Sequence, residues 1–322
     1  MSILKKFKYI LSDTGIEKVI LPFYNNYFPQ KNKTGGSSNG EYVLQIFLLQ
    51  TYFLKVKNAK KTESLNFNNI CEFGPGDSLA IGLMYMIIYK SKYIGFDAYP
   101  YCDKKISFQA CSDALTLLNK IDSISALREF MNNNRFINYI NIEELFLHIK
   151  NYILPKARSV SDGDIMDALD NVQYFAPYDL RDHHSKYEFD FIFSQAVLEH
   201  CVNLDEIYKF QKSNLSNNGV AYNHIDFKSH GTSFRWNGQY GISNKVYKSL
   251  EKSNTFQWIN RMPISHHESL IKGNDLNLFE LIKFTHDEGI SMNKVSKDMK
   301  PFIKDQDDLN THSSIVMSCR NI

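Results

Sequence analysis

Paired cysteines, long apolar runs and a surplus of charge of one sign are all missing from this chain. Its five cysteines are odd in number and show no C-x-x-C spacing, which favours reduced thiols in a cytoplasmic protein. No apolar stretch reaches the roughly 20 residues that span a bilayer. The first residues lack the apolar core and cleavage site of a signal peptide. We therefore expect a soluble, cytoplasmic protein without stable membrane insertion.

The charge balance also excludes a class of partner. The net charge is +2, from 37 basic and 35 acidic side chains, and no basic stripe extends beyond Lys55–Lys61. Nucleic acid is therefore not an expected partner. With 43% apolar residues over 322 positions, the chain can bury one large core domain that carries an insert. Homo-oligomerisation is left open.

The first part of the chain is predicted to be helical. Residues 1–65 form an N-terminal helical extension, which the polar loop Lys31–Gly40 divides. Tyr42–Lys57 has the spacing of an amphipathic helix that leads into the core domain, residues 66–322.

A β-α-β unit opens the core domain. It consists of a strand at Phe67–Phe73, a helix from Ser78 to Tyr89 and a strand at Tyr93–Phe96, the arrangement that builds parallel sheets. A helix is predicted at Leu204–Leu215, with Asn217–Gly219 as its stop signal. Further strands are predicted at Val172–Phe175, Phe189–Phe193, Val220–Asp226 and Ser313–Ser318.

The sheet pattern stops between residues 103 and 170. This stretch is too long and too apolar for a plain loop, so we interpret it as a helical insert that closes over the site as a lid. Helices are predicted at Phe108–Lys120, Ser123–Phe130 and Ile142–Ile153, and a turn region at Pro155–Asp164.

The loop Glu72–Ser78 between the first strand and helix is the main candidate for ligand binding. Its glycines, Gly74 and Gly76, let backbone approach a ligand, and the helix N-terminus offers unpaired N–H groups. Asp97 ends the second strand 21 residues after Gly76, where an acid can accept hydrogen bonds from both ribose hydroxyls.

Two kinds of cofactor fit such a loop. A nicotinamide dinucleotide fold requires a third glycine three residues after the second, and Leu79 stands there. The pattern G-x-G-x-S suits a ligand that carries an amino acid in place of a pyrophosphate. A nicotinamide oxidoreductase and a cofactor-binding module without turnover remain the alternatives.

The chain resembles the class I S-adenosyl-L-methionine-dependent methyltransferases. Glu72–Ser78 is similar to the family's first motif, with Ser78 where glycine is commoner, and Phe189–His200 is similar to its fourth. Leu215–Val220 departs from the usual L-K-P-G-G at the proline and one glycine. The resemblance covers roughly residues 66–226, without the insert. It implies a Rossmann-like α/β sheet with helices on both faces.

The same resemblance implies which residues bind S-adenosylmethionine. Asp97 falls at the ribose position, and Asp179, which follows a strand, at the position whose acid meets the adenine amino group. The residues expected to line the cofactor are Glu72, Gly74, Gly76, Asp77, Ser78, Asp97, Tyr178, Asp179, Ser194 and Gln195.

A second resemblance concerns the acceptor. Asn223–Gly231, Trp236–Gly238 and Ile259–Arg261 are similar to a subgroup of bacterial methyltransferases associated with polysaccharide and small-molecule biosynthesis. We expect a small polar acceptor, such as a sugar or a nucleotide-linked sugar, methylated on oxygen.

An oxygen acceptor loses its proton as it attacks, so a base within reach is useful. Ligands of open α/β sheets lie beyond the carboxyl ends of strands, where His200, Asp226 and His230 are found. His230 is the first choice for the base, with Asp226 to orient or replace it. For each, a purely structural role is an open alternative, and for His200 a capping or packing role is favoured.

Arg261 and Trp236 are candidates for acceptor binding. Arg261 suits an anionic group, with an ordinary surface ion pair as the equal alternative. Trp236, in a wall with Tyr240 and Trp258, suits a sugar face, although core packing explains most such residues. No metal is expected, because the pairs His183–His184 and His266–His267 have no third ligand at a diagnostic spacing.

Overall fold

The computed structural model describes Ile20 and residues 37–59, 67–132, 134, 136–183, 186–252 and 258–320. The predicted helices before residue 37 lie outside these residues, as does His184.

The core is a seven-stranded sheet in the order β3-β2-β1-β4-β5-β7-β6. β1 pairs in parallel with β2 and β4, and β2 pairs in parallel with β3. The first five positions match the Rossmann order 3-2-1-4-5-6, and β7 is inserted before β6. The predicted Rossmann-like α/β fold is therefore confirmed. The strands are β1 Asn69–Phe73, β2 Lys92–Phe96, β3 Gln173–Phe175, β4 Phe189–Gln195, β5 Leu215–Asp226, β6 Asn277–Thr285 and β7 Thr311–Cys319.

Helices and single turns connect the strands. The α-helices are α3 Gly40–Thr51, α5 Ala80–Tyr89, α6 Lys104–Asn119, α7 Ile124–Met131, α8 Ile142–His148, α9 Leu154–Ala157, α10 Asp162–Asn171, α11 Leu204–Asn214, α12 Asn244–Lys252, α13 Ile264–Gly273 and α14 Gln306–Asn310. The π-helical turns are η1 Tyr52–Lys57 and η3 Ile149–Ile153. The 3₁₀ turns are η2 Ile137–Tyr139, η4 Leu180–His183, η5 Leu198–His200, η6 Gly238–Gly241 and η7 Met292–Lys294.

The described residues divide into two compact units. Unit 1 contains those at 196–209 and 223–318, and unit 2 contains those at 37–195, 210–222 and 319–320. The helices of the segment 103–170 belong to unit 2. In this unit α6 contacts α3, α5, α9 and α10. The closure of this segment over an acceptor stays a prediction.

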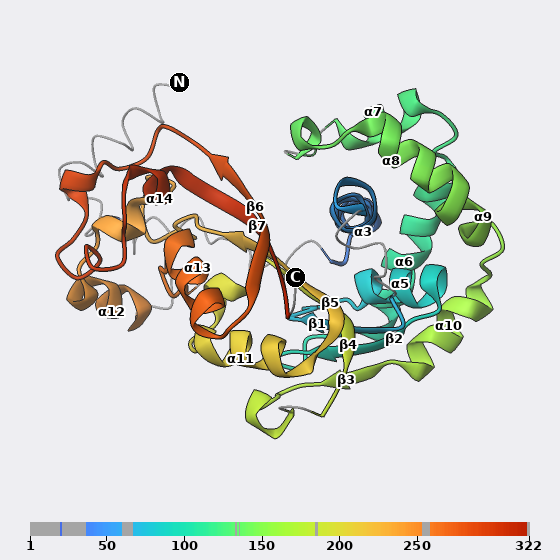
Figure 1. The fold of residues 1–322 in the computed structure, drawn as a ribbon, viewed down its shortest axis with the longest axis horizontal. Helices are drawn as coiled ribbons and strands as arrows, with labels where there is room; N and C mark the ends of the chain where they lie inside the picture. The colour runs from blue at the N-terminus through green and yellow to red at the C-terminus, as the bar shows by residue number, and fades with distance from the viewer. Residues whose placement is uncertain are drawn as a thin grey trace. The chain divides into compact units, whose positions relative to one another are not determined.

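The helix predicted at Tyr42–Lys57 exists as α3 and η1, but it is not amphipathic. Its residues Val43, Leu44, Phe47, Leu48 and Leu49 are all fully buried, around most of its circumference. In Figure 1 α3 is seen end-on, and within unit 2 it contacts α5 and α6. The side chain of Asn39 starts the helix by accepting a hydrogen bond from Tyr42 N at 3.2 Å.

Two local predictions are wrong, and one strand was missed. Asn217–Gly219 is not a helix stop, because α11 ends at Asn214 and β5 begins at the next residue. A Cβ on Gly219 would lie 2.5 Å from Phe189 O, so this glycine permits close strand contact. The region Pro155–Asp164, predicted as a turn, is helical at both ends, where it belongs to α9 and α10. β6 was not predicted, since its residues are mostly half-buried and show no clean alternation.

Aromatic side chains pack on both faces of the parallel strands in unit 2. On one face, Tyr85 of α5 lies 5.4 Å from Phe191 and 5.9 Å from Phe193, measured between ring centroids. On the other face, Phe210 of α11 lies 5.3 Å from Phe73 and 5.6 Å from Phe96. Helices therefore cover both faces, as predicted (Figure 1).

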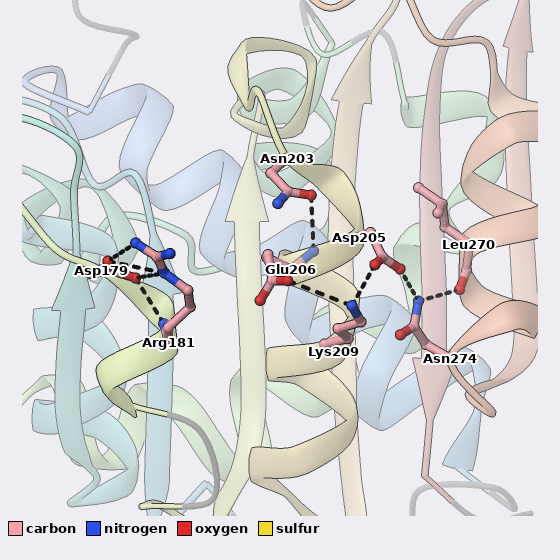
Figure 2. Close-up of polar contacts among 8 residues, drawn as sticks. All are labelled: Asp179, Arg181, Asn203, Asp205, Glu206, Lys209, Leu270 and Asn274. Carbon is pink, nitrogen blue, oxygen red and sulfur yellow. Dashed lines mark hydrogen bonds and ion pairs between the residues drawn. The ribbon is translucent and has the colours of Figure 1, made fainter.

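Polar contacts fix the start of α11 within unit 1 (Figure 2). Asn203 Oδ1 accepts a hydrogen bond from Glu206 N at 3.4 Å. Asp205 receives the Lys209 ammonium at 2.7 Å and the Asn274 amide at 2.9 Å. Asn274 also donates to Leu270 O at the end of α13. These contacts hold the first turn of α11 and connect it to the end of α13.

None of the helices among the described residues is long and apolar enough to cross a membrane.

Phe210→Ala should lower the free energy of unfolding by about 3–5 kcal/mol, because it removes a fully buried ring that packs against β1 and β2 and leaves a cavity. Denaturant unfolding measures this loss. The matched control is Phe302→Ala, whose ring is 38% exposed, and for which we expect a much smaller effect. Equal losses for the two variants would contradict the described packing.

Candidate cofactor site and acceptor-side cluster

The glycine loop follows β1 directly and turns tightly into α5. Gly74 and Gly76 have φ angles of 66° and 72°, which side chains with a Cβ rarely adopt. Gly74 N donates to Phe96 O at 2.8 Å, and Gly76 N donates to Asp97 Oδ2 at 2.9 Å. Both glycines predicted from the motif therefore adopt the backbone conformation that the turn needs.

Asp97 ties the end of β2 to this loop. Its second carboxylate oxygen accepts a hydrogen bond from Tyr99 N at 3.3 Å, and its residue is only 6% exposed. The pKa of Asp97 is raised because its carboxyl group is buried, and the hydrogen bond from the backbone N–H of Gly76 offsets only part of this rise. The sequence analysis predicted that Asp97 binds ribose, but it did not reveal that the same carboxylate also holds the glycine loop.

Glu72 lies at the end of β1 and is fully enclosed. Burial raises the pKa of this carboxyl group to about 8, so it is largely protonated at neutral pH. The hydroxyl of Tyr93 donates to Glu72 Oε2 at 2.6 Å. Glu72 therefore links β1 to β2 within the sheet.

Asp77 and Ser78 have different environments. The Ser37 hydroxyl lies 2.8 Å from Asp77 Oδ1 and 3.0 Å from Pro75 O, a contact that the motif alone does not reveal. The Ser78 side chain is fully buried, and its Oγ accepts a hydrogen bond from Ala80 N at 3.2 Å. Ser78 thus satisfies a backbone donor at the start of α5.

Tyr178 and Asp179 follow β3, as the resemblance requires. The ring of Tyr178 lies 5.7 Å from that of Phe96. Asp179 is exposed and pairs with Arg181, whose Nε and Nη2 lie 2.9 and 2.5 Å from its two oxygens (Figure 2). These hydrogen bonds lower the pKa of Asp179 to about 2. Arg181 was not foreseen from the sequence.

Ser194 and Gln195 end β4. Ser194 is fully buried and pairs in register with Phe73, whereas Gln195 is half-buried. All ten predicted cofactor residues therefore belong to unit 2, at or near the carboxyl ends of β1, β2, β3 and β4.

The candidate catalytic residues lie together in unit 1. The rings of His200 and His230 have their centroids 5.1 Å apart. Burial lowers the pKa of His200 to about 4, so its imidazole is neutral at pH 7. Asp226 Oδ2 lies 2.7 Å from Lys228 Nζ. Although burial acts in the opposite direction, the charge of Lys228 lowers the pKa of Asp226, so this carboxylate is a weaker base than an ordinary aspartate.

Glu199, which directly precedes His200, also belongs to this cluster. One potential ligand atom each from Glu199, His200 and His230 lie within 4.8 Å of one another. The histidine pairs weighed from the sequence behave differently, since buried His267 bonds to the Tyr208 hydroxyl at 2.9 Å. Asn260, which was also missed, donates through Nδ2 to Leu198 O and Cys201 O at 2.7 and 3.0 Å.

Arg261 and Trp236 already have protein partners in unit 1. Arg261 donates to Ile242 O and to Asn244 Oδ1, and its guanidinium carbon lies 4.0 Å from the centroid of the Tyr247 ring. Trp236 is half-buried beside the rings of His286 and His312. Their roles in acceptor binding stay predictions.

The proposed aromatic wall is divided between clusters. Tyr240 packs with Ile290 and Leu309, whereas Trp258 packs against Tyr247 and Ile259.

No protein-family model matches the chain, and no curated protein matches it in sequence. Solved structures match it at low identity. Geranyl diphosphate C-methyltransferase from Streptomyces coelicolor A3(2) is 12% identical with a TM-score of 0.41, over 84% of this chain and 78% of that one. A sarcosine dimethylglycine methyltransferase candidate from Galdieria sulphuraria is 9% identical with a TM-score of 0.42, over 85% and 87%. A TehB-like S-adenosylmethionine-dependent methyltransferase from Corynebacterium glutamicum is 11% identical with a TM-score of 0.35, over 86% and 97%.

All three TM-scores are below 0.5, so these likenesses carry no argument about activity. The strand order of the chain is that of a Rossmann-like α/β fold, and its glycine loop is hydrogen-bonded to Asp97.

Asp97→Ala should weaken the binding of S-adenosylhomocysteine by about 1.5–3 kcal/mol, or roughly 10- to 150-fold, because hydrogen bonds to a charged group are lost. Calorimetry on the folded variant measures this. Asp122→Ala, an exposed aspartate of the same unit, is the control and should bind normally. An unchanged dissociation constant in folded Asp97→Ala would show that Asp97 does not contact the ligand.

Proposed function

We propose that this protein is an S-adenosylmethionine-dependent methyltransferase that acts on a small polar acceptor. The single observation that supports this most is the glycine loop. Its two left-handed glycines precede a helix N-terminus and are tied to an acid at the end of β2. Glycines at these two positions let the backbone approach a ligand closely, and the acid at the end of β2 suits ribose.

Leu79 favours this cofactor over a nicotinamide dinucleotide. In dinucleotide-binding folds a glycine at this position allows close packing of helix and strand. Leu79 is buried, and its Cδ2 would be 3.5 Å from a Cβ built on Gly95 of β2. A bulky side chain therefore fills the space that close packing would require.

Methyl transfer needs few chemical groups from the protein. The sulfonium already activates the methyl carbon, so holding the acceptor in line supplies much of the rate. We propose that the acceptor's proton is taken within the cluster of His230, Asp226 and His200. His230 is the first candidate, because the pKa of His200 and of Asp226 are both lowered.

The acceptor class rests on sequence resemblance alone. The segments around His224, Trp236 and Arg261 favour a sugar or a nucleotide-linked sugar, methylated on oxygen. The alternatives are a cofactor-binding module without turnover and a nicotinamide-dependent oxidoreductase.

Calorimetry should detect binding of S-adenosylmethionine and S-adenosylhomocysteine with micromolar-scale affinity, and no binding of NAD. The reason is the G-x-G-x-S loop, in which Leu79 replaces the third glycine. NAD binding without any response to S-adenosylhomocysteine would overturn the proposed class. Release of S-adenosylhomocysteine with a panel of sugars and nucleotide-linked sugars then separates an enzyme from a binding module.

His230→Ala should lower turnover by about 10²–10⁴-fold, which is the usual contribution of a positioned base. Cofactor affinity should stay the same, because His230 is not among the residues that we propose to bind the cofactor. Turnover and melting temperature are measured on the same preparation. A destabilised variant with normal turnover per folded molecule would assign His230 to the scaffold.

A further inference from the structure

Three side chains of unit 1 converge from two turns. Glu199 and His200 belong to η5, which follows β4, and His230 belongs to the turn that follows β5. One nitrogen or oxygen atom of each lies within 4.8 Å of the others. Their chemistry, two imidazoles and one carboxylate, is that of a transition-metal site with open positions.

Glu199 gives the second, independent observation. It is only 4% exposed, and neither of its carboxylate oxygens has a hydrogen-bond partner among the described residues. Burial raises the pKa of Glu199 and the nearby charge of Asp226 raises it further, whereas the backbone of Glu199 and Asp226 and the charge of Lys228 lower it by less. A buried ionised carboxylate without a partner is strongly unfavourable, so this group needs either a proton or a cation.

Both histidines are oriented to present the same nitrogen. His200 Nδ1 lies 2.5 Å from Trp258 O, and His230 Nδ1 lies 2.7 Å from Lys228 O. A carbonyl oxygen only accepts, so each Nδ1 carries the proton and each Nε2 keeps a lone pair. A backbone carbonyl behind the outer nitrogen is the usual support of a metal-binding histidine.

The backbone that carries these residues is held on both sides. Asn260 donates to the carbonyls of Leu198 and Cys201, and Asn260 N donates to Glu199 O at 2.8 Å. His230 has a φ angle of 46°, which is uncommon for a residue with a side chain. Such a conformation is found disproportionately at functional sites.

We propose that Glu199, His200 and His230 bind a divalent transition-metal cation of the Zn²⁺ type through one carboxylate oxygen and two Nε2 atoms. Mg²⁺ and Ca²⁺ prefer oxygen ligands, so they fit this set poorly. At a tetrahedral ion with bonds of about 2.1 Å the ligand atoms are about 3.4 Å apart. Binding therefore draws the side chains together, and no hydrogen bond holds the Glu199 carboxylate back.

Three protein ligands leave a coordination position for a small molecule. A hydroxyl bound there would have a lowered pKa, so it would lose its proton more readily. In the metal-bound protein His230 is a ligand in place of the base, and because the bound hydroxyl is more acidic, a weaker base such as Asp226 can take the proton. This role rests on the proposed methyl transfer, but cation binding does not.

Zn²⁺ titration calorimetry of the chelator-treated full-length protein tests the site. We expect one Zn²⁺ per chain, with affinity lowered about 100-fold or more in Glu199→Gln and His230→Gln. His266→Gln, a half-buried histidine whose ring lies against Phe302, is the matched control and should bind as the original protein does. Co²⁺ should give a visible absorption band in the original protein, and Glu199→Gln should lose it.

Thermal unfolding separates this role from a scaffold role. Zn²⁺ should raise the melting temperature of the original protein and not that of Glu199→Gln, since only a ligand bound to the folded state stabilises it. Without metal, Glu199→Gln should be no less stable, because it removes a buried carboxyl group that has no partner.

Two results would overturn the proposal. The first is a folded original protein that does not bind Zn²⁺, and the second is Zn²⁺ binding that Glu199→Gln and His230→Gln leave unchanged. Neither measurement uses S-adenosylmethionine, so a failure of the proposed methyl transfer would be seen separately.

Discussion

The hydrogen bond from Gly76 N to Asp97 Oδ2 is the contact on which the cofactor site depends. Together with the bond from Gly74 N to Phe96 O, it fixes the backbone of the loop to the end of β2. Both glycines adopt the positive φ angles that this turn requires, a conformation that residues with a Cβ rarely adopt. The proposed ligand therefore meets a loop backbone and a carboxylate that are already positioned.

The first β-α-β unit was predictable because its signals are local. β1, α5 and β2 are short, strongly apolar elements, and a glycine turn separates β1 from α5. β6 was missed because its two faces are similarly exposed, which removes the alternation that reveals a strand. The Asn217–Gly219 sequence suits a turn by propensity. In the structure these residues belong to β5, where Gly219 lies close to the carbonyl oxygen of Phe189.

The polar partners of the site were less predictable, because they come from distant parts of the sequence. Ser37 contacts Asp77 across 40 positions, and Asn260 holds the Leu198 carbonyl across 62. No periodicity or motif encodes such contacts. Glu199 was visible beside His200, but only the structure shows that its carboxylate is buried without a partner and close to His230.

A crystal structure of the complex with S-adenosylhomocysteine tests the central claim most directly. The account predicts the ribose hydroxyls within hydrogen-bond distance of Asp97 and the amino-acid part against the backbone of Gly74–Gly76. Density for the ligand elsewhere, or a ribose that does not contact Asp97, would contradict it.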